Sequence, residues 1–181
     1  MRLIPHLLFL FIAVPTFGQT DAFRFLQEKY PDAKNVFLYQ STLRALNLEN
    51  NEDYNKLVAD VDKVSILILG DVMGELEGNT TEEEKEKHEQ IEVDRTDFSD
   101  VIGMLKEEQF VEVMSMESKG QKSAIYNEDS NDPEKFVIVV SNENGLTIAD
   151  LKGSIDISLL FKLKDSSPEI LKAIMNGKGL F

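Results

Sequence analysis

The sequence has no cysteine, no tryptophan and only two histidines among its 181 residues. Without cysteine, the chain has no disulfide, no thiol nucleophile and no thiol for lipid attachment after export. Zinc sites take most of their ligands from cysteine and histidine, so no zinc site is expected. His6 lies in an apolar N-terminal segment, and only His88 could serve a Ser-His-Asp triad. Because His88 lies in a charged stretch without rigid support, we expect no triad.

Basic residues are also scarce, with 19 Lys and Arg against 33 Asp and Glu and a net charge of −14. This charge repels phosphate backbones and anionic lipids, so neither nucleic acid nor a membrane surface is an expected partner. The negative charge is compatible with binding of a cation or a basic protein. Gly70 and Gly74 have neither the P-loop lysine nor the spacing of a dinucleotide-binding loop, and no cofactor is predicted.

Residues 1–18 have the three-part pattern of an export signal. Arg2 supplies the positive start, and residues 7–14 form an apolar run too short to span a bilayer. Thr16 and Gly18 are small residues at the positions that precede a cleavage site. The pattern predicts an exported protein, periplasmic or extracellular, with no membrane anchor after cleavage. It is not a lipoprotein, because no cysteine follows the signal.

Residues 19–181 are predicted to form one α+β domain. We expect a mostly antiparallel sheet of five to six strands with helices packed largely on one face. The four successive strands between residues 110 and 152 imply an antiparallel meander. Thr20 or Asp21 can cap the first helix. The strand, helical crossover and strand from 36 to 69 would form a right-handed βαβ unit if the two strands are parallel neighbours. The predicted elements are helices over 21–30, 51–61 and 97–105, strands over 35–39, 64–69, 110–116, 122–126, 136–140 and 146–151, and a helical run starting near 156.

The strongest local signal is Asn144-Gly145 between the apolar runs 136–140 and 146–151. Asn and Gly both tolerate positive φ, so this pair predicts a hairpin. The uninterrupted apolar character of the first run predicts a strand that is covered on both faces.

A second structural motif, Gly153, Ile155 and Asp156, follows the hairpin. Gly153 suits a tight turn, Ile155 suits the core and Asp156 suits the N-cap of the next helix. A catalytic role for Asp156 is the alternative, but the spacing favours capping.

Three segments are polar or amphipathic rather than strand-like. Residues 71–95 form an acidic insertion or mobile loop, in which Thr81 and Glu84 match a capping box. Residues 165–181 are predicted to form a C-terminal amphipathic helix. The loop 128–134 is rich in carboxylates but lacks the glycine of a calcium-binding EF-hand, so no metal site is predicted.

These observations predict no catalytic, cofactor-binding or metal-binding residue. We expect a non-catalytic domain of the cell envelope, accessory or protein-binding, whose partner is another envelope protein bound at a sheet edge or at the acidic insertion. The alternatives are a carboxylate-based hydrolase and a small-ligand carrier. The sequence indicates no oligomeric state.

Several segments, in this order, resemble the domain of unknown function 4252 family, small exported proteins of Gram-negative bacteria. The resemblance implies no activity. Many members of this family carry a lipoprotein cysteine, which is absent here, and residues 71–95 are longer than the family pattern. The matching segments, which span most of residues 21–164, are 25–39, 64–69, 98–105, 122–126 and Gly153-x-Ile155-Asp156-Ile157.

Cleavage after Gly18 predicts an exported chain that begins at Gln19. Mass spectrometry of the N-terminal peptide of the exported protein measures this directly. A chain that still begins at Met1 or Arg2 would contradict the predicted signal.

Overall fold

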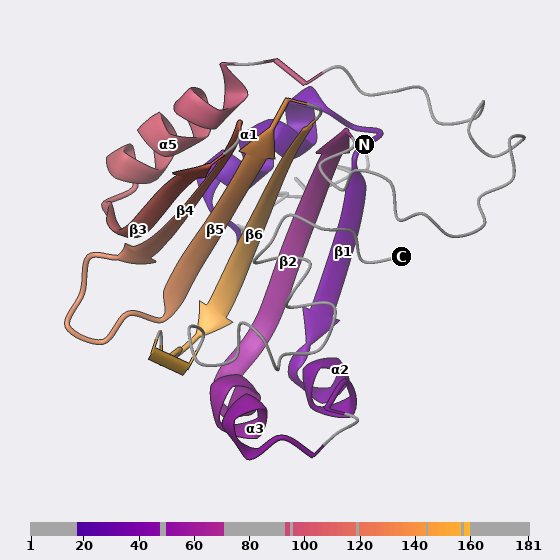
Figure 1. The fold of residues 1–181 in the computed structure, drawn as a ribbon, viewed down its shortest axis with the longest axis vertical. Coiled ribbons are helices and arrows are strands. Elements are labelled where there is room, and N and C mark those ends of the chain that lie inside the picture. Colours follow the sequence, from indigo (N-terminus) through magenta and orange to yellow (C-terminus); the bar gives the residue numbers. More distant parts are fainter. Residues whose placement is uncertain are drawn as a thin grey trace, which may run out of the picture.

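The computed structural model describes residues 18–47, 50–70, 93–94, 96–118, 120–143, 145–156 and 158–159. Within these ranges the chain forms one six-stranded antiparallel sheet accompanied by helices (Figure 1). The predicted α+β class is therefore confirmed. The C-terminal helix predicted over 165–181 and nearly all of the signal and the acidic insertion lie outside the described residues.

The strands are joined mainly by local connections. In the sheet they lie in the order β1-β2-β6-β5-β4-β3, and every neighbouring pair is antiparallel. The last four in sequence form the predicted meander, and β5 and β6 form the predicted hairpin with Asn142 opposite Gly145. The strands are β1 (Lys34–Tyr39), β2 (Val61–Gly70), β3 (Phe110–Ser118), β4 (Gln121–Glu128), β5 (Lys135–Asn142) and β6 (Gly145–Gly153).

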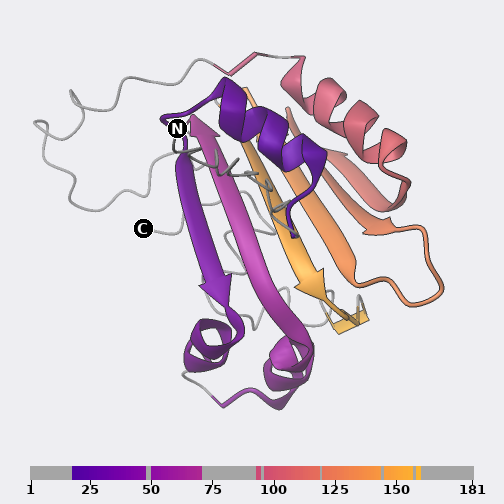
Figure 2. The same ribbon diagram turned by 180° about the vertical axis from the view of Figure 1, so that it is seen from behind.

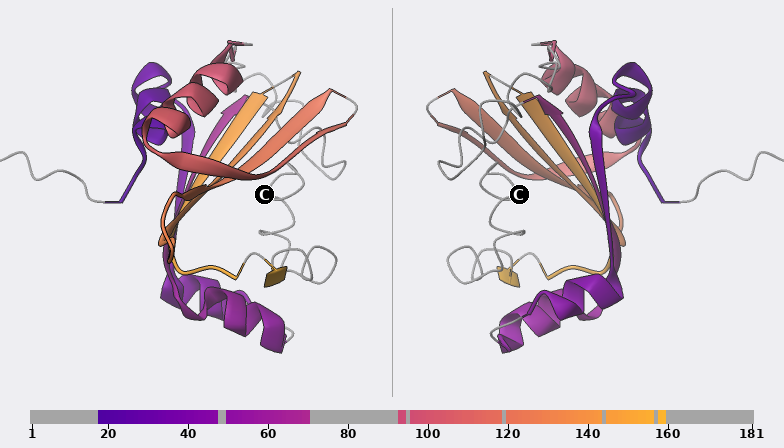
Figure 3. Two further views of the ribbon diagram at one scale, coloured as in Figure 1. Left: turned by 90° about the vertical axis from the view of Figure 1, so that its left-hand side faces the viewer. Right: turned by 90° about the vertical axis from the view of Figure 1, so that its right-hand side faces the viewer.

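The helices are divided between the two faces of the sheet, so the expectation that they pack largely on one face is not confirmed. Helices α1 (Asp21–Lys29) and α5 (Asp97–Glu107) lie side by side on one face, here called the helical face (Figures 2 and 3). Helices α2 (Gln40–Ala45) and α3 (Glu52–Ala59) lie at one end of the sheet and project toward the other side, here called the second face.

The conditional βαβ unit between the first two strands is wrong, because β1 and β2 are antiparallel neighbours. A parallel crossover must carry the chain back along the whole strand, which spans about 20 Å for six residues. Helices of six and eight residues are each only about 9–12 Å long. The hydroxyl of Tyr54 donates to the carbonyl oxygen of Leu43 at 2.7 Å and holds the two helices together as a corner.

The central strands are buried on both faces. Along β2, Leu67 and Leu69 point to the helical face, and Ile66 and Ile68 point to the second face. This explains the uninterrupted apolar runs, since alternation of polar and apolar residues needs one wet face. The helical face includes Phe23, Leu26, Leu67, Leu69, Val101, Leu105, Val137, Val139 and Ile148. The second face includes Leu43, Tyr54, Leu57, Ile66, Ile68, Ile138, Val140, Ala149 and Leu151.

Gly153 ends β6 in a position that only glycine can occupy. Its φ is +127°, and an added Cβ would lie 2.0 Å from the carbonyl oxygen of Asp60 and 2.7 Å from the Cα of Val61. The Gly153 N–H donates to the carbonyl oxygen of Glu134 at 2.7 Å. The close approach fixes the register between the last residue of β6 and the start of β2.

Replacing Gly153 with alanine should destabilise the domain by at least about 3 kcal/mol, because the new methyl group clashes with backbone that cannot rotate away. Urea unfolding followed by circular dichroism measures this loss. Gly120→Ala is the matched control: Gly120 also has positive φ, but no atom lies within 4 Å of its added Cβ. Its cost should stay at about 1–2 kcal/mol. Equal losses in the two variants would exclude the clash.

Candidate functional site

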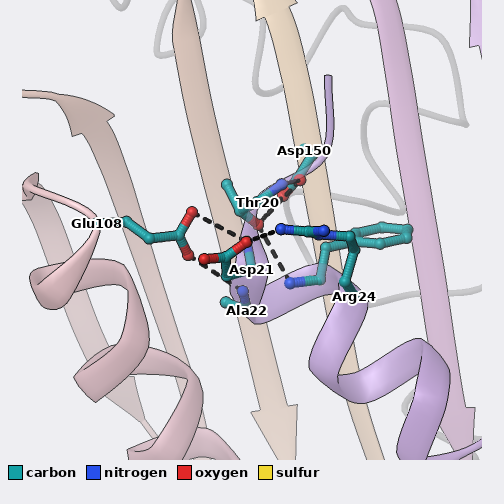
Figure 4. Close-up of polar contacts among 7 residues, drawn as sticks. Thr20, Asp21, Ala22, Arg24, Glu108 and Asp150 are labelled. Atoms are coloured by element: carbon teal, nitrogen blue, oxygen red, sulfur yellow. Dashed lines mark hydrogen bonds and ion pairs between the residues drawn. The ribbon is translucent and has the colours of Figure 1, made fainter. Parts of the chain in front are cut away.

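The start of α1 is attached to β6 through a buried carboxylate (Figure 4). The backbone N–H of Thr20 donates to Oδ2 of Asp150 at 2.7 Å. The Thr20 hydroxyl lies 3.1 Å from Oδ1 and 3.0 Å from Oδ2 of the same carboxyl group. Both residues are buried, and Asp150 is only 5% exposed. The contact joins residues 130 positions apart and holds the first helix on the sheet.

The same residues satisfy the free N–H groups at the start of α1. Thr20 is the N-cap, and its Oγ1 accepts from the N–H of Phe23 at 3.2 Å. Glu108, at the end of α5, accepts from the N–H groups of Asp21 and Ala22 at 2.9 and 3.1 Å. Because Thr20 Oγ1 accepts a hydrogen from Phe23, its own hydrogen is free to point at Asp150. Every donor at this helix end therefore has a partner.

Burial raises the pKa of Asp150 from its ordinary value to about 7. The two hydrogen bonds from Thr20 act in the opposite direction, since they favour the charged carboxylate. Nearby Glu108 adds to the rise and Lys135 opposes it. Desolvation is the largest of these effects, so Asp150 binds a proton far more readily in the folded protein than in water.

A second buried carboxylate, Asp97, joins α1 to α5. Asp97 is fully buried and accepts from the Lys29 ammonium and the Tyr30 hydroxyl, each at 2.6 Å. The hydrogen bond to Asp97 is the main reason why the pKa of Lys29 is raised. Burial, followed by the bond to Asp97, raises the pKa of Tyr30. The network fixes the two helices of the helical face against each other.

Both buried carboxylates have structural partners on their oxygen atoms. A general acid or base must reach the proton it transfers, and Asp150 and Asp97 are 5% and 0% exposed. Their geometry supports helix attachment rather than catalysis. Thr20 was one of two predicted caps for the first helix, with Asp21, and the structure selects Thr20. A helix-attaching role was predicted for neither carboxylate. For Asp150 a signal did exist, namely one acidic residue inside the apolar run 146–151.

The structure places most of the predicted motif residues at the two ends of β6. Gly145 is paired with both Asn142 and Gly70 at its start, whereas Asn144 lies outside the described residues. Ile155, past the other end, is 7% exposed within the core of the second face. Asp156 is exposed, and its Oδ1 accepts from the N–H of Ser158 at 2.8 Å, as an N-cap does. These residues surround a strand and do not converge on one site.

Large apolar side chains are exposed on the two edge strands. On β3, Val111, Val113 and Met116 are 41%, 39% and 50% exposed. On β1, Phe37 and Tyr39 are 42% and 57% exposed, but the Lys63 ammonium lies 4.7 Å from the centre of the Phe37 ring. Among the described residues β3 is paired on one side only, with β4, so its other edge offers backbone donors and acceptors.

Within the part of the chain that the structure describes, no three acidic or histidine side chains are grouped to hold a metal ion. No helix there is long and apolar enough to cross a membrane. His88 lies outside these ranges. The surface that remains as a candidate site is the outer edge of β3.

The raised pKa of Asp150 predicts a loss of stability as pH rises. Between about pH 4 and pH 7 the folded state holds a proton that the unfolded state has released, so this contribution is complete below about pH 4 and lost through pH 7. Relative to Asp150→Asn, the free energy of unfolding should fall by roughly 2.5 kcal/mol between about pH 5 and pH 8. Urea unfolding of both proteins at each pH measures this difference in free energy of unfolding. The contributions of the other titrating groups are common to both proteins and cancel.

The carboxyl ¹³C shift of Asp150 gives the midpoint of its titration independently. A difference between the two proteins that does not change with pH would mean that the Thr20 hydrogen bonds keep Asp150 charged.

The chain was compared with protein-family models, with curated proteins and with solved structures, and none of the three comparisons gives a match. The resemblance to the domain of unknown function 4252 family therefore stays a prediction from the sequence.

Proposed function

We propose that this chain is an exported, non-catalytic domain of the cell envelope that binds a segment of another envelope protein along the outer edge of β3. The observation that carries the proposal is a nine-residue strand, paired on one side among the described residues, that exposes three large apolar side chains. Such an edge can accept an added strand, whose affinity comes from main-chain hydrogen bonds.

The side chains of β3 favour a particular partner. Val111 and Met114 lie opposite Asn127 and Ile125 of β4, and Met116 lies opposite Ser123, so all three belong to the second face. An added strand could place an apolar side chain beside each of them, because cross-strand neighbours on one face contact each other.

Charge adds a second preference. Glu112 and Glu117 lie on the same strand, and the chain has an acidic excess throughout. A partner segment that carries lysine or arginine beside its apolar positions complements this edge. Glu112 accepts from the hydroxyls of Ser115 and Tyr126, so its carboxylate is held in place on the strand.

The edge also has a feature that limits indiscriminate pairing. The register of β3 against β4 shifts between Glu112 and Met114, which indicates a β-bulge. Bulges twist an edge strand and discourage aggregation through it. The residues from Met114 to Ser118 lie beyond the bulge in regular register, and we place the main contact there.

The hydrolase alternative has one observation in its favour, the pKa of about 7 at Asp150. Perturbed carboxyl groups are frequent in active sites. Here the carboxyl group is only 5% exposed, and both of its oxygen atoms are hydrogen-bonded to Thr20. Burial of the carboxyl group is the main cause of this raised pKa and accounts for it without a reaction.

The double variant Val111→Lys with Met116→Lys tests the edge, because charged side chains there oppose the addition of an apolar strand. A tagged parent protein first captures its partner from envelope extracts, and the purified partner is then titrated calorimetrically. We expect binding at least about tenfold weaker, equivalent to about 1.4 kcal/mol.

The matched control is Phe37→Lys with Tyr39→Lys, which adds the same charge to exposed apolar positions on the opposite edge strand. Its affinity should stay within about twofold of the parent. Circular dichroism checks that both variants fold. Equal losses in the two variants, or binding lost only on deletion of residues 71–95, would contradict the assignment to β3.

A further inference from the structure

The second face of the sheet is buried where no described helix covers it. Val140 and Ile138 on β5 are 1% and 5% exposed, and Ala149 on β6 is fully buried. Among the described residues, α2 packs on β1 and β2, and both α2 and α3 lie at one end of the sheet (Figure 3). The side chains farther along β5 and β6 have no helix over them in that part of the chain.

A sheet face that is open to water leaves its side chains exposed, so these low values require a second layer. On the opposite side, the neighbouring Val137 and Val139 are covered by α1 and α5, and both are also fully buried. The side chains named on both faces are at most 5% exposed, although described helices cover only the helical face along its length. Something else covers the second face.

We propose that residues 160–181 of the same chain form this cover. After β6 ends at Gly153, Ile155 is buried in the cluster of the second face, and Leu159 packs against that cluster. The chain therefore leaves its described part while lying on this face. Residues 160–181 follow directly, so their effective concentration at the second face is high.

The length and composition of residues 160–181 fit the same surface. The helix predicted over 165–181 would span about 26 Å, and the eight residues of β5 also span about 26 Å. The positions Ile170, Leu171, Ile174 and Met175 follow a helical spacing and give one apolar side. Residues 71–92 suit this role less well, since acidic residues dominate them and apolar residues are sparse.

The absence of cysteine allows a test in the full-length chain. A single cysteine at Val140 reports access to the second face through its reaction rate with a maleimide. We expect the Val140→Cys thiol to react at least about tenfold faster when Ile170, Leu171, Ile174 and Met175 are all replaced by serine. Val139→Cys is the matched control, because the side chain of Val139 is buried on the helical face. Its rate should not change.

Three results would overturn the proposal. The first is an unchanged rate at Val140→Cys, which would mean that another segment covers the face. The second is an equal acceleration at both cysteines, which would mean that the replaced residues support the whole fold. The third is a rate at Val140→Cys that falls with protein concentration before any serine replacement, which would identify a second copy as the cover. The test involves neither the β3 edge nor its partner, so the two proposals fail separately.

Discussion

The structure depends on one constraint: the central strands β2, β6 and β5 are apolar on both faces, so the sheet needs a layer on each side. The chain has no disulfide to support a thinner fold. Helices α1 and α5 supply one layer, and α2 and α3 supply part of the other. A domain of this kind is held together by burial of apolar surface, and each covering element must then be attached with the correct register.

Attachment is the role of the few polar groups in the interior. Asp150 holds the start of α1 through Thr20, and Asp97 holds the end of α1 to the start of α5 through Lys29 and Tyr30. Burial of a carboxylate without hydrogen bonds carries a large free-energy penalty. Each of the two carboxylates therefore avoids this penalty only when its helix lies in the position that supplies the hydrogen bonds. The raised pKa of Asp150 shows that its cost is only partly offset. Asp150 therefore favours a specific position of α1 more than it favours stability.

The two edges of the sheet differ in what they offer to a partner. On β1, Lys63 lies over the exposed ring of Phe37. On β3, three large apolar side chains are exposed along a strand that contains a bulge. The exposed apolar side chains of β3 are the observation that supports the proposed binding function. This is the reason for placing the proposed function on the surface of the sheet.

The α+β class, the meander, the hairpin of β5 and β6, and a cap at Thr20 or Asp21 could be predicted from the sequence, because these depend on local turn chemistry and apolar periodicity. The antiparallel pairing of β1 and β2, the division of the helices between two faces, and the contact of Asp150 with Thr20 over 130 positions became evident only in three dimensions. The pairing of distant segments depends on which surfaces fit together, and the spacing of residues along the chain carries little information about that. Gly153 illustrates the difference. A turn at this glycine could be predicted from the sequence, but the nearby backbone of Asp60, which excludes any other residue there, could not.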